Sequence, residues 1–144
     1  MQLIGFNFHN IKAEKHSINK PIKNINTDIE FTDIEKEKIE LIKDGEPLKF
    51  SFKFSITYQE SQEKNADKIG DVTFQGNIIM LAEKELSKEI LKLWKKKQLS
   101  PQVRAGLSNI LLRRCSPKAV VLEEDINLPS HLPIPQVQIQ KDQQ

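Results

Sequence analysis

The 144-residue sequence contains a single cysteine, Cys115, and no long run of apolar residues. One cysteine cannot form a disulfide within the chain, which excludes the disulfide-stapled class of small secreted domains. The longest apolar runs, residues 78–82 and 119–122, fall far short of the roughly 18 residues that a membrane span needs. The N-terminus has no basic stretch followed by an apolar one. We therefore expect no signal peptide, no membrane insertion and a cytoplasmic protein.

Residue types that support catalysis and metal binding are also scarce. The five glycines form no phosphate-binding loop, and the three histidines, His9, His16 and His131, show no i, i+4 pairing. We therefore expect no metal site and no cofactor. Cys115 lies beside an apolar helical stripe and is expected to pack as a small hydrophobic residue. The carboxylates of residues 123–125 are interpreted as a solvated helix end, and the absence of a convergent nucleophile and base predicts a protein that is not an enzyme.

The net charge of +2 hides an uneven distribution of charge along the chain. Residues 83–118 contain ten lysines or arginines and three glutamates, so the rest of the chain is acidic. Such a basic segment indicates either an acidic partner, such as nucleic acid, or the solvated face of two helices. Nucleic-acid binding is not favoured, because no aromatic residue is interleaved with the lysines to stack on bases.

What the sequence does contain is strict alternation. In residues 48–58 (LKFSFKFSITY) every even position is apolar or aromatic and every odd position is polar. This pattern predicts a β-strand with one buried and one solvated face. Residues 69–81 predict a second long strand, in which Gly76 indicates a bulge or a close approach by another element. The polar residues 60–68 between the two strands predict a hairpin connection.

Two more strands are expected before the long pair. Weaker alternation at residues 4–8 and 25–31 predicts them, whereas residues 34–42 fit neither a strand nor a helix period. Residues 44–47 (DGEP) predict a turn. Four antiparallel strands, joined by hairpins and one longer connection, therefore account for the first 81 residues.

The period then changes to that of a helix. Residues 82–99 predict an amphipathic helix, and Ser100-Pro101 supplies the N-cap and first-turn proline of a second helix that continues to about residue 114. Ser116-Pro117 either kinks that helix or starts a short final one through residue 122. The first helix places its apolar residues on one stripe, at Leu86, Ile90, Leu93 and Trp94.

The segment from residue 126 (INLPSHLPIP) contains three prolines, which forbid a helix and impose an extended path. Residues 1–135 are predicted to form a single α+β domain, and residues 136–144 a polar tail. The domain is expected to be a four-stranded antiparallel sheet with two or three helices packed on one face. The long strands offer more apolar residues than two helices can bury. We therefore expect some apolar surface to be covered by another subunit or left as a groove.

This order of elements resembles that of the SecB-like protein-export chaperone family. Three local features carry the resemblance: the aromatic strand KFSFKFSITY (residues 49–58), the strand end TFQGNIIML (73–81), and SNILLRR (108–114) followed by INLPSHLPIP (126–135). The family's helix element commonly begins with a Cys-Pro pair, for which the two Ser-Pro pairs are the nearest equivalents here. The sequence ends before the further helix that bacterial members carry, so it resembles a reduced member of the family.

The resemblance implies an ATP-independent chaperone that binds unfolded or preprotein polypeptide in apolar grooves. It also implies a homo-oligomer, a dimer that pairs into a tetramer. A core position is an equal alternative for every groove or contact residue that it suggests. Leu132 and Ile134 are the better functional candidates, because an extended proline-rich segment usually lies on the surface. The full set of candidates for peptide binding or oligomer contact is Phe50, Phe52, Phe54, Trp94, Leu128, Leu132 and Ile134.

A second hypothesis is a non-enzymatic adaptor or structural subunit with one dedicated partner. In this hypothesis the partner, for example nucleic acid, binds through the basic helix surface at residues 92–97 and 113–114. The chaperone hypothesis requires assembly into an oligomer, whereas the adaptor hypothesis does not.

Overall fold

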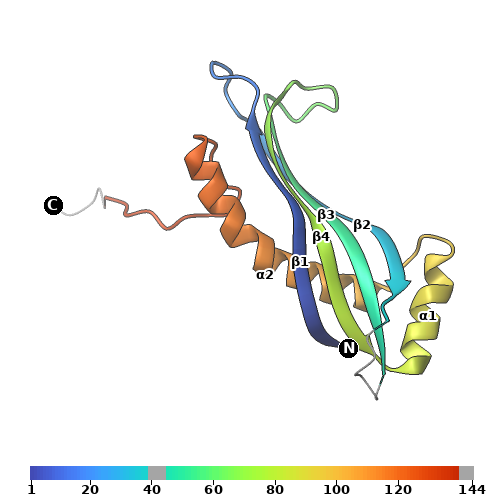
Figure 1. The fold of residues 1–144 in the computed structure, drawn as a ribbon. Coiled ribbons are helices and arrows are strands. Elements are labelled where there is room, and N and C mark those ends of the chain that lie inside the picture. Colours follow the sequence, from blue (N-terminus) through green and yellow to red (C-terminus); the bar gives the residue numbers. More distant parts are fainter. Residues whose placement is uncertain (39–44, 140–144) are drawn as a thin grey trace.

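The computed structural model describes residues 1–38 and 45–139. In this part of the chain four strands precede two helices. They are β1 (Gln2–Lys15), β2 (Asn24–Lys36), β3 (Glu46–Gln59), β4 (Lys68–Ala82), α1 (Lys84–Trp94) and α2 (Pro101–Asp125). The strands form one antiparallel sheet, α2 runs along one of its faces, and α1 lies against β2 and β3 (Figure 1). The predicted α+β class, with an antiparallel sheet of four strands and helices packed on it, is confirmed.

The strand order is β1-β4-β3-β2, which puts the first two strands of the chain at opposite edges of the sheet. The connections from β2 to β3 and from β3 to β4 are therefore hairpins, whereas β1 pairs with β4. The predicted hairpin between the long strands is thus confirmed. In the register of the central pair, Phe50 lies opposite Ile78 and Phe54 opposite Phe74. The apolar sides of the two long strands consequently fall on the same face of the sheet.

Each of the two edge strands contains a β-bulge and continues past the residue at which its alternation predicted it to end. The register shifts between Phe8 and Asn10 in β1 and between Phe31 and Asp33 in β2. Each bulge moves the apolar positions by one residue, so the period of two is lost although the strand continues. This explains why β1 was predicted to end near residue 8. It also explains part of the ambiguity after residue 31.

Gly76 lies in β4 opposite Phe8, where β1 is bulged and its backbone comes close to β4. A Cβ atom at this position would lie 2.0 Å from the carbonyl oxygen of Asn7, so only glycine fits. The close approach predicted at Gly76 is therefore confirmed. Part of the predicted turn at residues 44–47, and of the ambiguous segment before it, lies in residues 39–44, outside the described residues.

Helix α2 is one continuous element. The Ser100 side chain accepts a hydrogen bond from the backbone N–H of Val103 at 3.3 Å, which confirms the predicted N-cap, and Pro101 occupies the first turn. The helix continues through Pro117, so an end near residue 114 is wrong, and so is a separate final helix, which was one of the two alternatives for Ser116-Pro117. Proline removes one intrahelical donor. The loss is tolerated because α2 is pinned to the core on both sides of it, through Val103, Leu107, Leu111, Cys115 and Ala119.

The core lies between α2, α1 and one face of the sheet. All the even residues of β3 from Leu48 to Tyr58 are buried, and the aromatic side chains among them each contribute about 2–3 kcal/mol through burial. The opposite face of β3 carries lysine, serine and threonine. The chain's own helices therefore cover the central strands, and the apolar surface that remains among the described residues includes an open groove, one of the two alternatives expected from the sequence. No helix in residues 1–38 and 45–139 is long and apolar enough to cross a membrane.

Candidate functional site

A buried carboxylate at the end of α2 anchors the chain that follows. Glu123 is only 1% exposed, and its carboxylate accepts a hydrogen bond from the Tyr58 hydroxyl. The backbone N–H of His131 donates to the same carboxylate at 2.9 Å, and the ring Nδ1 of His131 lies 2.8 Å from its second oxygen. The expectation of a solvated helix end is therefore wrong for Glu123, although Glu124 and Asp125 are exposed. Glu123 continues the buried four-residue spacing of α2 and meets polar partners there.

Leu128 is the apolar part of this anchor. Its backbone N–H donates to the carbonyl of Glu123 at 2.8 Å, and its side chain is buried against the sheet. A Cβ atom at Gly70 would lie 3.3 Å from a methyl group of Leu128 and 2.7 Å from the carbonyl oxygen of Glu14. Glycine at this position therefore makes room for Leu128. We assign Leu128 to the core anchor rather than to a binding surface.

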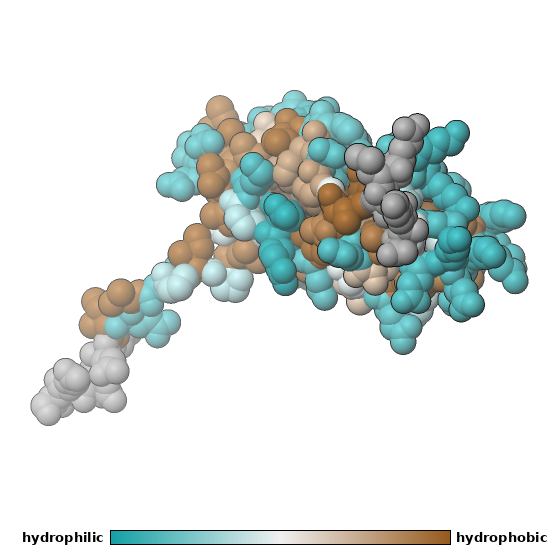
Figure 2. Space-filling model, turned by 60° about the horizontal axis from the view of Figure 1, so that its bottom comes forward, coloured by the Kyte–Doolittle hydropathy of each residue, from teal (hydrophilic) through white to brown (hydrophobic). Residues whose placement is uncertain are grey.

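Beyond the anchor the chain leaves the body of the molecule. Leu132 is 41% and Ile134 58% exposed, so these two predicted site residues are accessible. Val137 and Ile139 are more exposed still. Figure 2 shows apolar side chains on the tail that leads to the grey C-terminal residues, clear of the body. The extended segment therefore presents apolar side chains to solvent.

An apolar groove lies between the edge strand β1, β4 and the C-terminal half of α2. Its volume is about 240 Å³, and Ile11 and Val121 at its rim are 49% and 59% exposed. Exposed aliphatic side chains on both walls are typical of a site for apolar ligand groups. The lining residues are Ile11, Phe74, Lys118, Val121 and Leu122.

Two half-buried aromatic rings on β1 continue the apolar groove. Phe6 and Phe8 pack edge to face, with ring centroids 5.0 Å apart. The guanidinium of Arg114 lies 5.5 Å from the centroid of Phe6, and the ammonium of Lys118 lies 5.6 Å from that of Phe8. These cations are attracted to the ring faces and form a positive rim beside the aliphatic side chains. The rim can meet carbonyl or carboxylate groups of a bound chain.

Trp94 lies at the opposite edge of the sheet. It lines a cavity of about 520 Å³ next to β2, with Lys97 Nζ 4.7 Å from its ring centroid. Its indole Nε1–H is buried and has no acceptor among the described residues. Charged groups of both signs surround this cavity, so it differs in character from the apolar groove. The remaining lining residues are Asp28, Ile29, Glu30, Phe31, Thr32 and Arg104.

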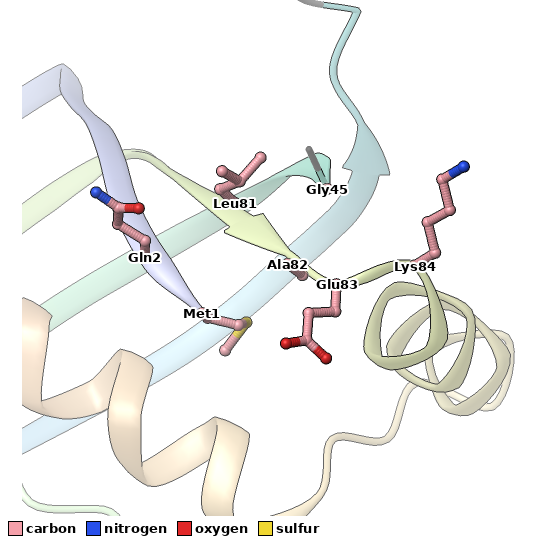
Figure 3. A pocket seen from close by; sticks show the side chains of 7 residues that line it. All are labelled: Met1, Gln2, Gly45, Leu81, Ala82, Glu83 and Lys84. Atoms are coloured by element: carbon pink, nitrogen blue, oxygen red, sulfur yellow. The ribbon is translucent and has the colours of Figure 1, made fainter. Parts of the chain in front are cut away.

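A third cavity, of about 560 Å³, lies where β4 runs into α1 (Figure 3). Figure 3 shows the side chains of Met1 and Glu83 close together, with Lys84 pointing away from them. The lining contains no histidine, cysteine, serine or threonine. It consists of Met1, Gln2, Gly45, Leu81, Ala82, Glu83 and Lys84.

The predicted site residues do not form one site. Phe50, Phe52 and Phe54 are covered by the chain's own helices, with at most 2% of any of them exposed. They are therefore core residues in this chain, the alternative that the sequence left equally open, and a partner cannot reach them. The residues that line the apolar groove were missed, because the β1 bulge hides Ile11 and because Pro117 left open whether α2 continues to Val121. Continuing the four-residue spacing past Pro117 would have placed the end of the helix.

Cys115 is fully buried in the core, which confirms that it packs as a small hydrophobic residue. Burial raises the pKa of its thiol to about 12. A thiol with that pKa carries almost no thiolate at neutral pH, so Cys115 is not an activated nucleophile.

The comparisons with known proteins agree with this architecture. No family model and no curated protein sequence matches the chain. Among solved structures, it is similar to the SecB-like chaperone Rv1957 of Mycobacterium tuberculosis, determined with a ChAD peptide from the Rv1956 HigA1 antitoxin. The TM-score is 0.50, the identity 14%, and the alignment covers 96% of this chain and 92% of the other. The sheet of four antiparallel strands, the two helices and this match identify the SecB-like chaperone fold in this chain.

Proposed function

We propose that this protein is an ATP-independent chaperone that holds unfolded polypeptide by binding extended apolar segments in the apolar groove. The observation that carries the proposal is the groove itself, whose exposed Ile11 and Val121 face each other across β1 and α2 on a SecB-like fold. Binding of unfolded chains alone shifts the folding equilibrium by mass action, and this requires no nucleotide. The Mycobacterium neighbour was solved with a peptide, which supports a polypeptide as the ligand class.

The chemistry of the groove suits segments that mix apolar side chains with backbone carbonyls. Aliphatic walls bind side chains of many shapes, because burial of apolar area is non-directional. Arg114 and Lys118 at the positive rim offer donors to the carbonyl groups of a chain lying across Phe6 and Phe8. Such a site selects apolar composition rather than a particular sequence, which is what a holdase requires.

We also propose a homo-oligomer that assembles through the β1 edge. Residues 2–11 of β1 contain no lysine, arginine, aspartate or glutamate, whereas β2 carries four acids and one lysine. Charged side chains on an edge strand discourage pairing with another sheet, so β2 is protected and residues 2–11 of β1 are not. A second copy paired antiparallel with β1 would continue the sheet about a two-fold axis. Because that axis is perpendicular to the sheet, the two apolar grooves would lie on the same side.

The adaptor hypothesis with nucleic acid as partner has less support. Lys97 and Arg104 each lie over an aromatic ring of the chain itself, so part of the basic surface is already engaged. Tyr58 is buried, and Trp94 is half-buried with Lys97 over its ring, so neither is presented for base stacking.

The experiment that tests the function is suppression of aggregation without ATP. An unrelated enzyme that aggregates on heating is incubated with stoichiometric amounts of this protein, and light scattering is recorded. We expect the wild-type protein to reduce scattering strongly and the Ile11→Asp variant to do so weakly. Undiminished scattering with the wild-type protein would refute the proposal.

The experiment that tests the assembly is size-exclusion chromatography with light scattering. The wild-type protein is expected to elute as a dimer or tetramer. Ile4→Lys, which puts a charge on the β1 edge, should shift it to monomer. Ile18→Lys, in the β1–β2 connection, is the matched control and should leave the mass unchanged. A monomeric wild-type protein would contradict the assembly.

A further inference from the structure

Two carboxylates and a histidine meet on the polar face of the sheet, where β1 ends. Glu14 lies directly opposite Asp71 in the β1–β4 register, and His16 follows two residues after Glu14. One ligand atom from each side chain lies within 4.8 Å of the other two. The backbone N–H of His16 donates to the carbonyl of Ile69 at 2.7 Å, which holds the end of β1 beside β4. The three side chains are thus brought together by the backbone.

Like charges directly opposite on neighbouring strands are unfavourable, so this pair needs cations. Lys12 Nζ lies 3.0 Å from Oε2 of Glu14, and Lys68 pairs with Oδ2 of Asp71. The lysines therefore use one oxygen of each carboxylate. Oε1 of Glu14 and Oδ1 of Asp71 remain, and Oε1 lies 3.7 Å from Nδ1 of His16.

The remaining oxygen of Asp71 is a separate feature that favours a bound ion. Asp71 is only 7% exposed, and its Oδ1 atom is buried and accepts no hydrogen bond from the described residues. A buried acceptor without a donor is costly, because it has lost water and gained nothing in exchange. A metal ion held between Asp71, Glu14 and His16 would satisfy such an atom.

We propose that Glu14, His16 and Asp71 form a binding site for a divalent transition-metal ion of the zinc class. One imidazole nitrogen and two carboxylate oxygens suit Zn²⁺, Co²⁺ or Ni²⁺, whereas Mg²⁺ and Ca²⁺ prefer oxygen ligands alone. Zinc binds such atoms at about 2.0–2.2 Å, so the ligands must move closer together. Glu14 and His16 are 44% and 39% exposed in their side chains and are free to rotate towards the buried Asp71. A fourth position remains open to water.

The ion would fasten the end of β1 to β4 next to the C-terminal anchor. Lys15 Nζ donates to the carbonyl of Asn127 at 3.0 Å, so the same stretch of β1 holds the chain that follows α2. The spacing of the three histidines and the single cysteine predicted no metal site. Asp71 is distant from His16 in sequence and adjacent only through the register of the sheet.

The test uses the full chain, stripped of metal with a chelator and titrated with Zn²⁺ by calorimetry and with Co²⁺ by visible absorption. We expect one ion per chain and a rise in melting temperature on adding Zn²⁺. His16→Asn, at an exposed position that does not threaten folding, should weaken binding at least about tenfold. Asp71→Asn should do the same.

His9→Asn is the matched control, because it makes the same substitution at another histidine of β1. The ring of His9 contacts Asn77 and is not part of the proposed site. We expect this variant to bind Zn²⁺ as the wild-type protein does. Absence of binding by the wild-type protein would overturn the proposal. So would binding that survives His16→Asn or that is lost in His9→Asn.

Discussion

Nδ1 of His131 lies 2.8 Å from Oε1 of Glu123, and both side chains are almost completely buried. This contact joins the end of α2 to the chain beyond it, and the Tyr58 hydroxyl joins both to β3. A carboxylate with three hydrogen-bonding partners is well satisfied, but its removal leaves three polar groups buried without a partner. The contact therefore fixes where the extended C-terminal segment leaves the body.

Replacing Glu123 should be the most damaging single change to a polar residue at this end of the molecule. Glu123→Ala leaves the Tyr58 hydroxyl and the two nitrogen atoms of His131 without their hydrogen-bond partner. We therefore expect a loss of about 3 kcal/mol in the free energy of unfolding. Urea denaturation measures it. Glu124→Ala, one residue along and exposed, should change stability by less than about 0.5 kcal/mol. Equal effects of the two substitutions would contradict the buried cluster.

Two glycines should respond to alanine in opposite directions. Gly76→Ala forces a Cβ atom against the carbonyl oxygen of Asn7, and a loss of about 3 kcal/mol or more is expected, because backbone must move. Gly106→Ala lies within α2, where a Cβ atom meets nothing within 4 Å. It should gain about 0.5–1 kcal/mol from helix propensity. Thermal or urea unfolding of both variants decides this, and a tolerated Gly76→Ala would refute the register of β1.

The Cys115 thiol should not react with thiol reagents in the native protein. Burial raises its pKa from 9.0 to about 12, so the native state favours the protonated form. The contribution of the protonated Cys115 thiol to the free energy of unfolding is fully present below about pH 9 and is lost as the pH rises towards 12. At pH 8 a thiol-specific chromogenic reagent should modify no cysteine in the native protein and one per chain after unfolding. Prompt modification of the native protein would show that Cys115 is accessible.

The central architecture follows from the sequence wherever a pattern is regular. The alternation of β3 from Leu48 to Tyr58 specifies a strand and its buried face, because no other backbone places those six side chains on one side. The Ser100-Pro101 pair likewise marks the start of α2, because both residues match the chemistry of a helix N-terminus.

The features that sequence reasoning missed depend on contacts between distant segments. Bulges in β1 arise from its pairing with β4, and they displaced Ile11 from the pattern. Pro117 does not break α2, because neighbouring residues are held by the core, which local propensity does not include. Glu123 looks like a surface residue in a run of acids until Tyr58 and His131 are brought to it. The apolar groove depends on the first two of these features, the bulge in β1 and the continuation of α2 past Pro117.

The proposed chaperone function depends most on the binding of polypeptide in the apolar groove. The direct measurement is the affinity of a fluorescently labelled, extended, apolar peptide, followed by anisotropy for the wild-type protein and two matched variants. Ile11→Asp puts a charge into the groove and should weaken binding at least about tenfold, because a carboxylate replaces apolar contact area. Ile18→Asp makes the same change at an isoleucine that is 87% exposed in the β1–β2 connection and should leave the affinity unchanged. Equal affinities for all three proteins, or no binding at all, would contradict the account.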